Sequence, residues 1–191
     1  MNVRGFEMEE RSRRIVDTAI ELANQGGYEA VRLRDVAADA GVALGTVYKR
    51  FQSKEEILLA ALEKEVGSFD ALIRQYPLEG PTPEQRVTQL FALATSAMCQ
   101  RENFARAVLR AVASGEPGLT ERITRFHSVI TSLIEITIEG PEGRTSDARV
   151  AYLLQQIWFA ALVGWMGGLH DEDEVVNQMR FAVTRLLAPL H

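Results

Sequence analysis

The chain has 191 residues, of which 47% are hydrophobic, which is enough for a folded core and too many for a largely disordered protein. Its single cysteine, Cys99, excludes an intrachain disulfide framework and favours a reducing cytoplasm, and the N-terminal segment contains no apolar core typical of a secretory signal. The net charge of -5 argues against a surface that is basic throughout.

The charge is unevenly distributed along the chain. Residues 1–54 carry nine Lys/Arg and eight Asp/Glu, a net charge of +1, whereas residues 55–191 carry twelve and eighteen, a net charge of -6. The cations of the first part cluster at residues 11–14, 32–34 and 49–54. This asymmetry is typical of a DNA-reading module attached to an acidic domain with another role.

Helical patterns begin near the N-terminus. Apolar residues recur at helical spacing over residues 8–25, and Gly26 and Gly27 are expected to end this helix. Residues 28–33 are predicted to be extended, and two short helices follow over residues 34–40 and 44–51. A long helix is predicted over residues 54–75, because Ser53 and Glu56 have the spacing of a capping box: the Ser53 hydroxyl accepts from the Glu56 backbone and the Glu56 carboxylate reaches back.

The second part of the chain also has only helical signals. Residues 77–81 form a Pro/Gly linker, and Thr82 and Pro83 start a helix that reaches residue 100. Further helices are predicted over residues 103–113, 119–139, 147–167 and 171–188, and no stretch alternates with a period of two. The predicted fold class is therefore all-α with about nine helices, divided into a DNA-binding domain over residues 1–53 and an effector-binding and dimerisation domain over residues 54–191.

Residues 150–169 contain no charge and have about the length that spans a bilayer. Gln155 and Gln156 interrupt this run, and its flanks give no positive-inside signal. We therefore favour a helix buried on two faces over a membrane span.

The acidic run 171–174 is interpreted as the start of a helix, favoured by the helix dipole, and a metal site is the alternative.

Residues 32–58 have the spacing of a helix-turn-helix. Ala37 lets the second helix approach closely, Gly41 takes the strained position in the turn, and Val47 anchors the second helix on the first. A purely structural pair of helices would use the same residues and is the alternative.

The second helix of this motif is predicted to turn a polar face outward, formed by Leu44, Gly45, Thr46, Tyr48, Lys49 and Arg50. Such a face fits a DNA major groove, with Thr46 and Lys49 near base edges and Tyr48 on a phosphate. Lys54 opens the next helix, where its charge and the free backbone N–H groups can hold a phosphate. Each cation taken alone is equally compatible with a solvated surface.

The segment GGYEAVRLRDVAADAGVALGTVYKRFQSKEEILLAAL combines a glycine-terminated helix, this motif, a Tyr-x-x-Phe and a lysine that opens a helix. It resembles the N-terminal signature of TetR-type transcription regulators over residues 14–62. The resemblance implies a two-domain helical fold, a homodimer formed through the last two helices, and release from a palindromic double-stranded DNA operator when a ligand binds. It also implies DNA contacts from Arg34, Thr46, Tyr48, Lys49 and Lys54.

A looser similarity extends beyond this segment. The residues GVALGTVYKRF, the QRV stretch at Gln85 and the ending IWFAALVGWMGGLHDEDEVVNQMRFAVTRLLAP resemble the repressors of bacterial steroid and cholesterol breakdown. The resemblance implies a small effector that is apolar or acyl-CoA-like. Lys49 and Arg50 stand where that branch has Arg-Tyr, which argues against a shared operator sequence.

Large apolar residues of the second domain can line an effector pocket or simply fill a core, and the sequence leaves both open. The candidates are Phe69, Leu72, Leu93, Phe104, Leu109, Phe126, Ile130, Leu133 and Trp158. Four arginines on adjacent helices could attract an anionic ligand group or be ordinary surface residues: Arg106, Arg110, Arg122 and Arg125.

The penultimate helix carries two apolar stripes, which indicates two packing partners. One stripe contains Val150, Leu154, Ile157, Ala161 and Trp165, and the other contains Leu153, Trp158, Leu162 and Met166. One stripe is expected to face its own domain and the other to join the last helix in a four-helix bundle with a second subunit. The predicted interface residues are Trp158, Ala161, Leu162, Trp165, Phe181 and Leu186.

An enzyme is not expected, because the sequence has no Gly-rich phosphate loop, nucleophile elbow or metal-ligand spacing. We accordingly expect no catalytic residue, cofactor, metal or membrane partner. A helical adaptor, or a ligand-binding module without DNA switching, would explain the acidic body but not the face formed by Lys49, Arg50 and Lys54. The predicted function is therefore that of a DNA-binding repressor released by an effector.

Overall fold

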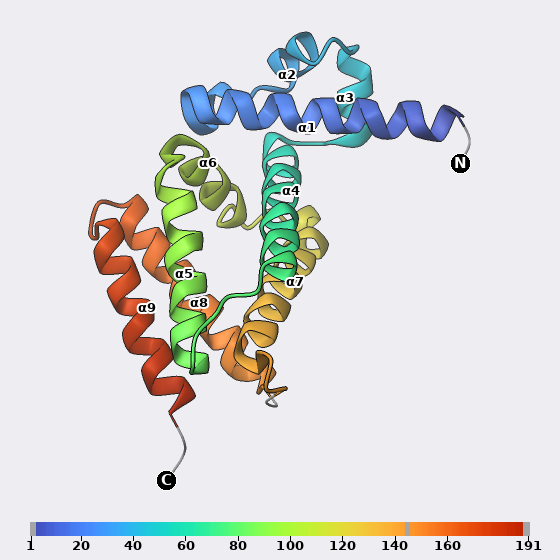
Figure 1. Cartoon of the computed structure of the whole chain (residues 1–191). Coiled ribbons are helices and arrows are strands. Elements are labelled where there is room, and N and C mark those ends of the chain that lie inside the picture. The colour runs from blue at the N-terminus through green and yellow to red at the C-terminus, as the bar shows by residue number, and fades with distance from the viewer. Residues whose placement is uncertain (1–2, 144–145, 189–191) are drawn as a thin grey trace. The chain divides into compact units, whose positions relative to one another are not determined.

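The computed structural model describes residues 3–143 and 146–188, and its regular elements are all helices (Figure 1). They are α1 (Val3–Ala30), α2 (Leu33–Asp39), α3 (Leu44–Arg50), α4 (Lys54–Gln75), α5 (Pro83–Cys99), α6 (Glu102–Val112), a 3-10 turn η1 (Pro117–Leu119), α7 (Thr120–Glu139), α8 (Ala148–Met166) and α9 (Glu172–Leu187). The predicted all-α class with about nine helices is confirmed for the described residues.

Packing divides the chain into two compact units. Unit 1 comprises residues 1–65 and 101–123, and unit 2 comprises residues 66–100 and 124–191. The first part of α4 and the whole of α6 therefore pack with the N-terminal helices. The domain boundary expected at residue 53 follows the helix-turn-helix motif and stays a prediction.

Unit 1 is built around α1. The pair α2 and α3 lies on one side of α1, and α6 packs on another side (Figure 1). The apolar face of α1 that the sequence predicted is buried, with Ile15, Ala19 and Ala23 at most 1% exposed. The facing side of α6 contributes Phe104, Ala105, Val108 and Ala111, all at most 3% exposed. This core holds the short helices α2 and α3 in place.

The prediction that residues 28–33 are extended is only partly correct. Gly26 and Gly27 leave the helical conformation, with φ of -136° and +65°, but α1 resumes after this kink and ends at Ala30. The Asn103 side-chain amide donates to the carbonyl oxygens of Asn24 and Gln25 at 3.1 and 3.3 Å. This contact from α6 supplies a donor to two carbonyls at the point where the glycines interrupt the helix.

Unit 2 contains the rest of α4 together with α5, α7 from residue 124 onward, α8 and α9. Helix α9 packs along both α5 and α8. The predicted helix starts are confirmed at Thr82, whose hydroxyl accepts from Gln85 N at 3.3 Å, and at Asp171, whose carboxylate accepts from Glu174 N at 2.8 Å. The acidic run therefore opens α9, as expected from the helix dipole.

The uncharged segment around α8 forms part of this packing. Ala151, Leu154, Ala161 and Leu162 are at most 3% exposed. Among the described residues, no helix is long and apolar enough to cross a membrane.

Candidate nucleic-acid interface

The turn between α2 and α3 has the predicted helix-turn-helix geometry. Gly41 has a φ of +65°, the left-handed conformation that glycine adopts without steric cost. The turn is closed by Val42 N, which donates to the Ala37 carbonyl at 3.0 Å. Ala37 is 3% exposed and Val47 is fully buried, so these two side chains join the helices as predicted. The two helices therefore hold each other in a defined orientation.

The opposite side of α3 is exposed. Leu44 and Tyr48 are 38% and 49% exposed. Gly45, Lys49 and Arg50 are also exposed, and Thr46 is half-buried. The structure thus brings together all six α3 residues of the predicted DNA-binding set on one accessible surface.

Arg34 lies on α2 and is also accessible. Its side chain is 81% exposed and makes one loose ion pair, 3.7 Å from the Asp35 carboxylate. A group so exposed is weakly held and can exchange its partner for a phosphate at little cost.

Lys54, by contrast, already has partners. Its Nζ lies 3.7 Å from the centre of the Tyr28 ring and 3.6 Å from Glu29 Oε2, and it donates to the Tyr28 carbonyl at 3.5 Å. Its side chain is only 27% exposed. Lys54 must therefore exchange Glu29 for a phosphate if it contacts DNA.

The start of α4 is capped differently from the predicted capping box. Ser53 Oγ accepts from Glu56 N at 3.2 Å, as expected. The Glu56 carboxylate, however, accepts from Gln52 N at 2.6 Å, one residue before the expected position, and Ser53 Oγ also donates to Glu116 at 3.2 Å. The extended backbone of Phe51 turns Gln52 N toward the helix, so the carboxylate reaches back one residue further.

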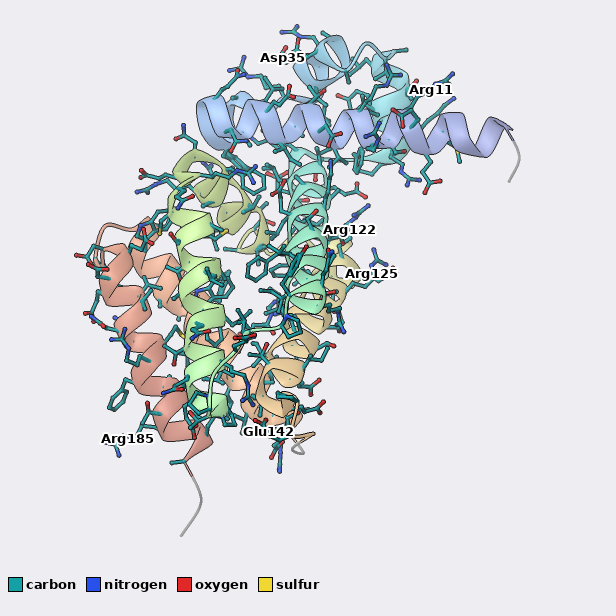
Figure 2. All side chains as sticks on the ribbon, viewed as in Figure 1. Arg11, Asp35, Arg122, Arg125, Glu142 and Arg185 are labelled. Atoms are coloured by element: carbon teal, nitrogen blue, oxygen red, sulfur yellow. The ribbon has the colours of Figure 1, made fainter. Side chains whose placement is uncertain are left out.

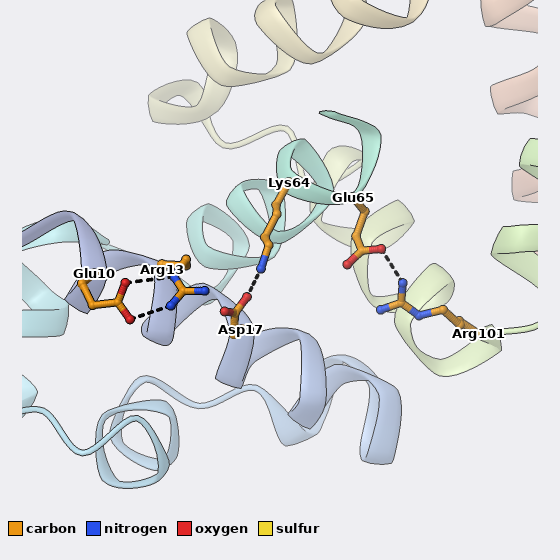
Figure 3. A network of polar contacts seen from close by, with 6 residues as sticks. All are labelled: Glu10, Arg13, Asp17, Lys64, Glu65 and Arg101. Carbon is orange, nitrogen blue, oxygen red and sulfur yellow. Dashed lines mark hydrogen bonds and ion pairs between the residues drawn. The ribbon is translucent and has the colours of Figure 1, made fainter. Parts of the chain in front are cut away.

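Ion pairs tie α4 to its neighbours in unit 1 (Figure 3). Lys64 pairs with Asp17 of α1, and Arg101 donates to Glu65 at 2.6 Å. On α1 itself, Arg13 pairs with Glu10 at 2.6 Å, and this hydrogen bond lowers the pKa of the Glu10 carboxyl. Part of the basic cluster at residues 11–14 is thus neutralised within its own helix.

Comparison with known proteins matches most of the chain to one family. The profile described as "Bacterial regulatory proteins, tetR family" matches residues 15–61, and the profile described as "Tetracyclin repressor-like, C-terminal domain" matches residues 80–186. The chain belongs to the TetR family. The helix-turn-helix and the exposed α3 face lie within the first of these matches.

Individual relatives agree with this assignment. The HTH-type transcriptional repressor KstR of Rhodococcus jostii (strain RHA1) is 30% identical over 178 residues, which are 93% of this chain and 83% of KstR. The crystal structure of a TetR transcriptional regulator from Rhodococcus sp. RHA1 has a TM-score of 0.86 at 21% identity and covers 97% of this chain and 100% of that one. FadR of Bacillus subtilis, solved in complex with stearoyl-CoA, has a TM-score of 0.66 at 19% identity and covers 94% of this chain and 99% of FadR.

The residues predicted to bind an effector in this TetR-family chain fall into three groups. Phe104 and Leu109 are buried in unit 1, on α6. Leu72 and Leu93 are about half exposed, at 51% and 49%. The remaining residues lie in unit 2. Phe126, Ile130 and Leu133 of α7 are buried, and Phe69 and Trp158 are half-buried.

Among the arginines considered as ligand anchors, Arg106, Arg110 and Arg122 pair with carboxylates. Arg110 donates to Glu29 at 3.0 Å, Arg106 pairs with Glu102 of its own helix at 2.8 Å, and Arg122, labelled in Figure 2, donates to Glu63 at 2.6 Å. Their positive charges are thus already balanced within unit 1.

Two polar contacts inside unit 2 were not predicted as site features. Gln155 is 2% exposed, and its amide accepts from Thr131 Oγ1 at 2.8 Å and lies 2.6 Å from His127 Nδ1. Burial lowers the pKa of His127. Trp158 Nε1 donates to the fully buried Thr95 at 3.0 Å. A glutamine in the middle of an uncharged helix is the sequence signal for the first contact, because a buried amide needs a partner.

Helix α8 has two apolar stripes, as predicted, but with different members. Ala161 and Leu162 are 3% and 2% exposed and face the chain's own helices, and Trp158 packs with its ring centre 5.7 Å from that of Phe91. The exposed stripe contains Tyr152, Leu153, Ile157 and Val163, all between 37% and 52% exposed. Of the predicted interface residues, Phe181 is 65% exposed, whereas Trp165 and Leu186 are intermediate.

Proposed function

We propose that this chain is a transcriptional repressor that binds a palindromic DNA operator and leaves it when a small effector binds. The observation that carries the proposal is the geometry of α2 and α3. Gly41 closes the turn, Val47 is buried beneath α3, and the other side of α3 is exposed. A structural pair of helices would not require so many accessible side chains on α3. Such an exposed, short helix is suited to lie in a major groove.

The residues of this interface have separate roles. Thr46 and Lys49 are proposed to reach base edges, and Tyr48 a phosphate oxygen. Arg34 and Lys54 are proposed to hold phosphates on either side of the groove. Leu44, Gly45 and Arg50 complete the surface. Base contacts set the sequence preference, whereas phosphate contacts set affinity for every duplex.

The protein is proposed to act as a homodimer. The exposed stripe of α8 with Phe181 of α9 is apolar, and a surface groove of about 580 Å³ lies beside it, lined by Ile157, Phe181 and Leu186 among others. A patch of this kind is typical of an interface between subunits. In the proposed dimer each subunit supplies one α3 helix, and the two helices enter successive major grooves about 34–36 Å apart, one turn of DNA.

The effector is proposed to be apolar or acyl-CoA-like. The structure of FadR in complex with stearoyl-CoA supports this class, because FadR is similar in fold to this chain. Within unit 2, Phe126, Ile130 and Leu133 supply an apolar wall. The His127–Gln155 pair could exchange its internal contact for a polar group of the ligand.

We assign no enzymatic activity to the chain and place it in the cytoplasm with the DNA it binds.

The DNA-binding part of the proposal is tested with operators selected from a random duplex library, titrated by fluorescence anisotropy at several salt concentrations. We expect Lys54→Gln to weaken binding to all duplexes and to reduce the slope of log K against log salt by about 1. We expect Thr46→Val to change the selected sequence instead. Lys64→Gln is the matched control, because Lys64 lies on the same helix and pairs with Asp17. Salt-independent binding, or equal effects of both lysine variants, would contradict the proposal.

The switching part is tested by repeating the titration with long-chain and steroid acyl-CoA thioesters. An effector that couples to DNA binding is expected to change operator affinity by about 5- to 150-fold. A protein that binds DNA but responds to none of these compounds would have a different effector class. A protein that binds a thioester but no duplex would be the ligand-binding module without DNA switching.

A further inference from the structure

The aromatic ring of Tyr28 contacts two cations from different helices. Lys54 Nζ of α4 is 3.7 Å from the ring centre, and Arg110 Cζ of α6 is 3.9 Å from it. Both cations are therefore within cation–π distance of the same ring. The ring itself is fixed, because its hydroxyl donates to the buried Glu55 carboxylate in the first turn of α4.

The same two cations also share the carboxylate of the next residue, Glu29. Arg110 donates to Glu29 Oε1 at 3.0 Å, whereas Lys54 lies 3.6 Å from Glu29 Oε2. Arg110 therefore has the closer contact and Lys54 the looser one. Glu29 itself is 71% exposed, so its side chain can move toward either cation.

We infer that Glu29 competes with a DNA phosphate for Lys54, and that Arg110 limits this competition by binding the same carboxylate. The inference rests on the proposed function, in which Lys54 holds a phosphate. The Lys54 ammonium cannot make its closest contact with the Glu29 carboxylate and with a DNA phosphate at the same time. A stronger ion pair between Lys54 and Glu29 therefore weakens DNA binding. Arg110 and Glu29 are positioning residues in this scheme, because neither needs to contact DNA.

The arrangement also makes the affinity for DNA depend on the position of α6. If α6 moves and takes Arg110 away from Glu29, the carboxylate keeps Lys54 as its single cation. The phosphate then has to displace a stronger ion pair. A displacement of α6 within unit 1 would therefore weaken DNA binding without any change in α3.

The experiment measures the affinity for a selected operator, and its salt dependence, for Arg110→Met, Glu29→Gln and the double variant. We expect Arg110→Met to lower affinity by about 2- to 5-fold, the range of one exposed ion pair. Glu29→Gln is expected to raise affinity, and the double variant to bind at least as tightly as the wild type, because without the carboxylate Arg110 no longer affects the competition for Lys54. In a Lys54→Gln background, Arg110→Met is expected to have no effect beyond that of the control.

Arg106→Met is that control. Arg106 lies one turn before Arg110 on α6 and pairs with Glu102 of the same helix. It therefore reports the general effect of removing one positive charge from this unit. A Glu29→Gln variant that binds DNA more weakly, or an Arg110→Met variant equal to Arg106→Met, would overturn the inference. If Lys54→Gln alone leaves binding unchanged, the proposed function of Lys54 fails, and the two failures are thereby distinguished.

Discussion

Two glycines of the helix-turn-helix differ in only one respect that matters for stability. Neither Gly41 nor Gly45 has any atom within 4 Å of the position that a Cβ would occupy. Gly41, however, has a φ of +65°, and Gly45 lies inside α3 with no positive φ. A side chain would thus find space at both positions and would meet backbone strain only at Gly41.

We therefore expect Gly41→Ala to lower the free energy of unfolding by about 1–2 kcal/mol, the cost of the left-handed conformation. Gly45→Ala should raise it by about 0.5–1 kcal/mol, because alanine is the better helix former. Urea denaturation of the two variants and the wild type measures both changes. Equal changes in the two variants would show that the turn does not require glycine.

At the scale of an element, the end of α7 depends on a residue from α5. Arg86 is 1% exposed, and its guanidinium donates to the carbonyls of Thr137 and Ile138, both at 3.2 Å. It also donates to Gly80 O at 2.9 Å and to Glu142 at 3.1 Å, whose position is labelled in Figure 2. The last carbonyls of a helix have no partners within it, so this one side chain caps α7 and fixes the linker before α5.

Arg86→Met is expected to destabilise the protein by about 2–4 kcal/mol, because it leaves buried carbonyls without a donor. Arg86→Lys should be intermediate, since an ammonium cannot reach all of these acceptors. Arg149→Met is the control: Arg149 pairs with Asp147 at 2.8 Å but is 88% exposed, and its loss should not be measurable in urea denaturation. A stability of Arg86→Met equal to that of this control would refute the capping role.

For the whole molecule, the question is how the exposed apolar stripe of α8 is covered. Its side chains are too large and too close together for ordinary solvent-exposed surface, and they continue to Phe181 of α9. A second copy of the chain covers this stripe in the proposed dimer. Affinity for a palindromic operator then requires both subunits, because each supplies one α3 helix.

We predict that Leu153→Asp and Phe181→Asp convert the protein to a monomer and abolish tight operator binding, since a buried, unpaired carboxylate would oppose association. Analytical ultracentrifugation measures the mass in solution. Leu93→Asp is the matched control, because Leu93 of α5 is 49% exposed, close to the 47% of Leu153. Dimers that persist in both stripe variants would place the interface elsewhere.

The sequence alone determined the features that depend on neighbours a few residues away. The bounds of α4 agree with the prediction, and the starts at Thr82 and Asp171 were recognised from their capping residues. The left-handed Gly41 and the buried Val47 also followed from spacing within one short motif. Periodicity and caps are local properties of the chain, so they can be read without its tertiary structure.

Only the tertiary structure decided which partner each side chain has. Arg110 lies 81 residues from Glu29, and Arg86 lies 51 residues from Thr137, so no local pattern could pair them. For the same reason, the exposed stripe of α8 differs from the predicted one, because contacts with α5 and α9 determine which face is buried. Charge and burial depend on packing between distant segments, and this packing places Lys54 beside Glu29 and Tyr28 rather than in open solvent.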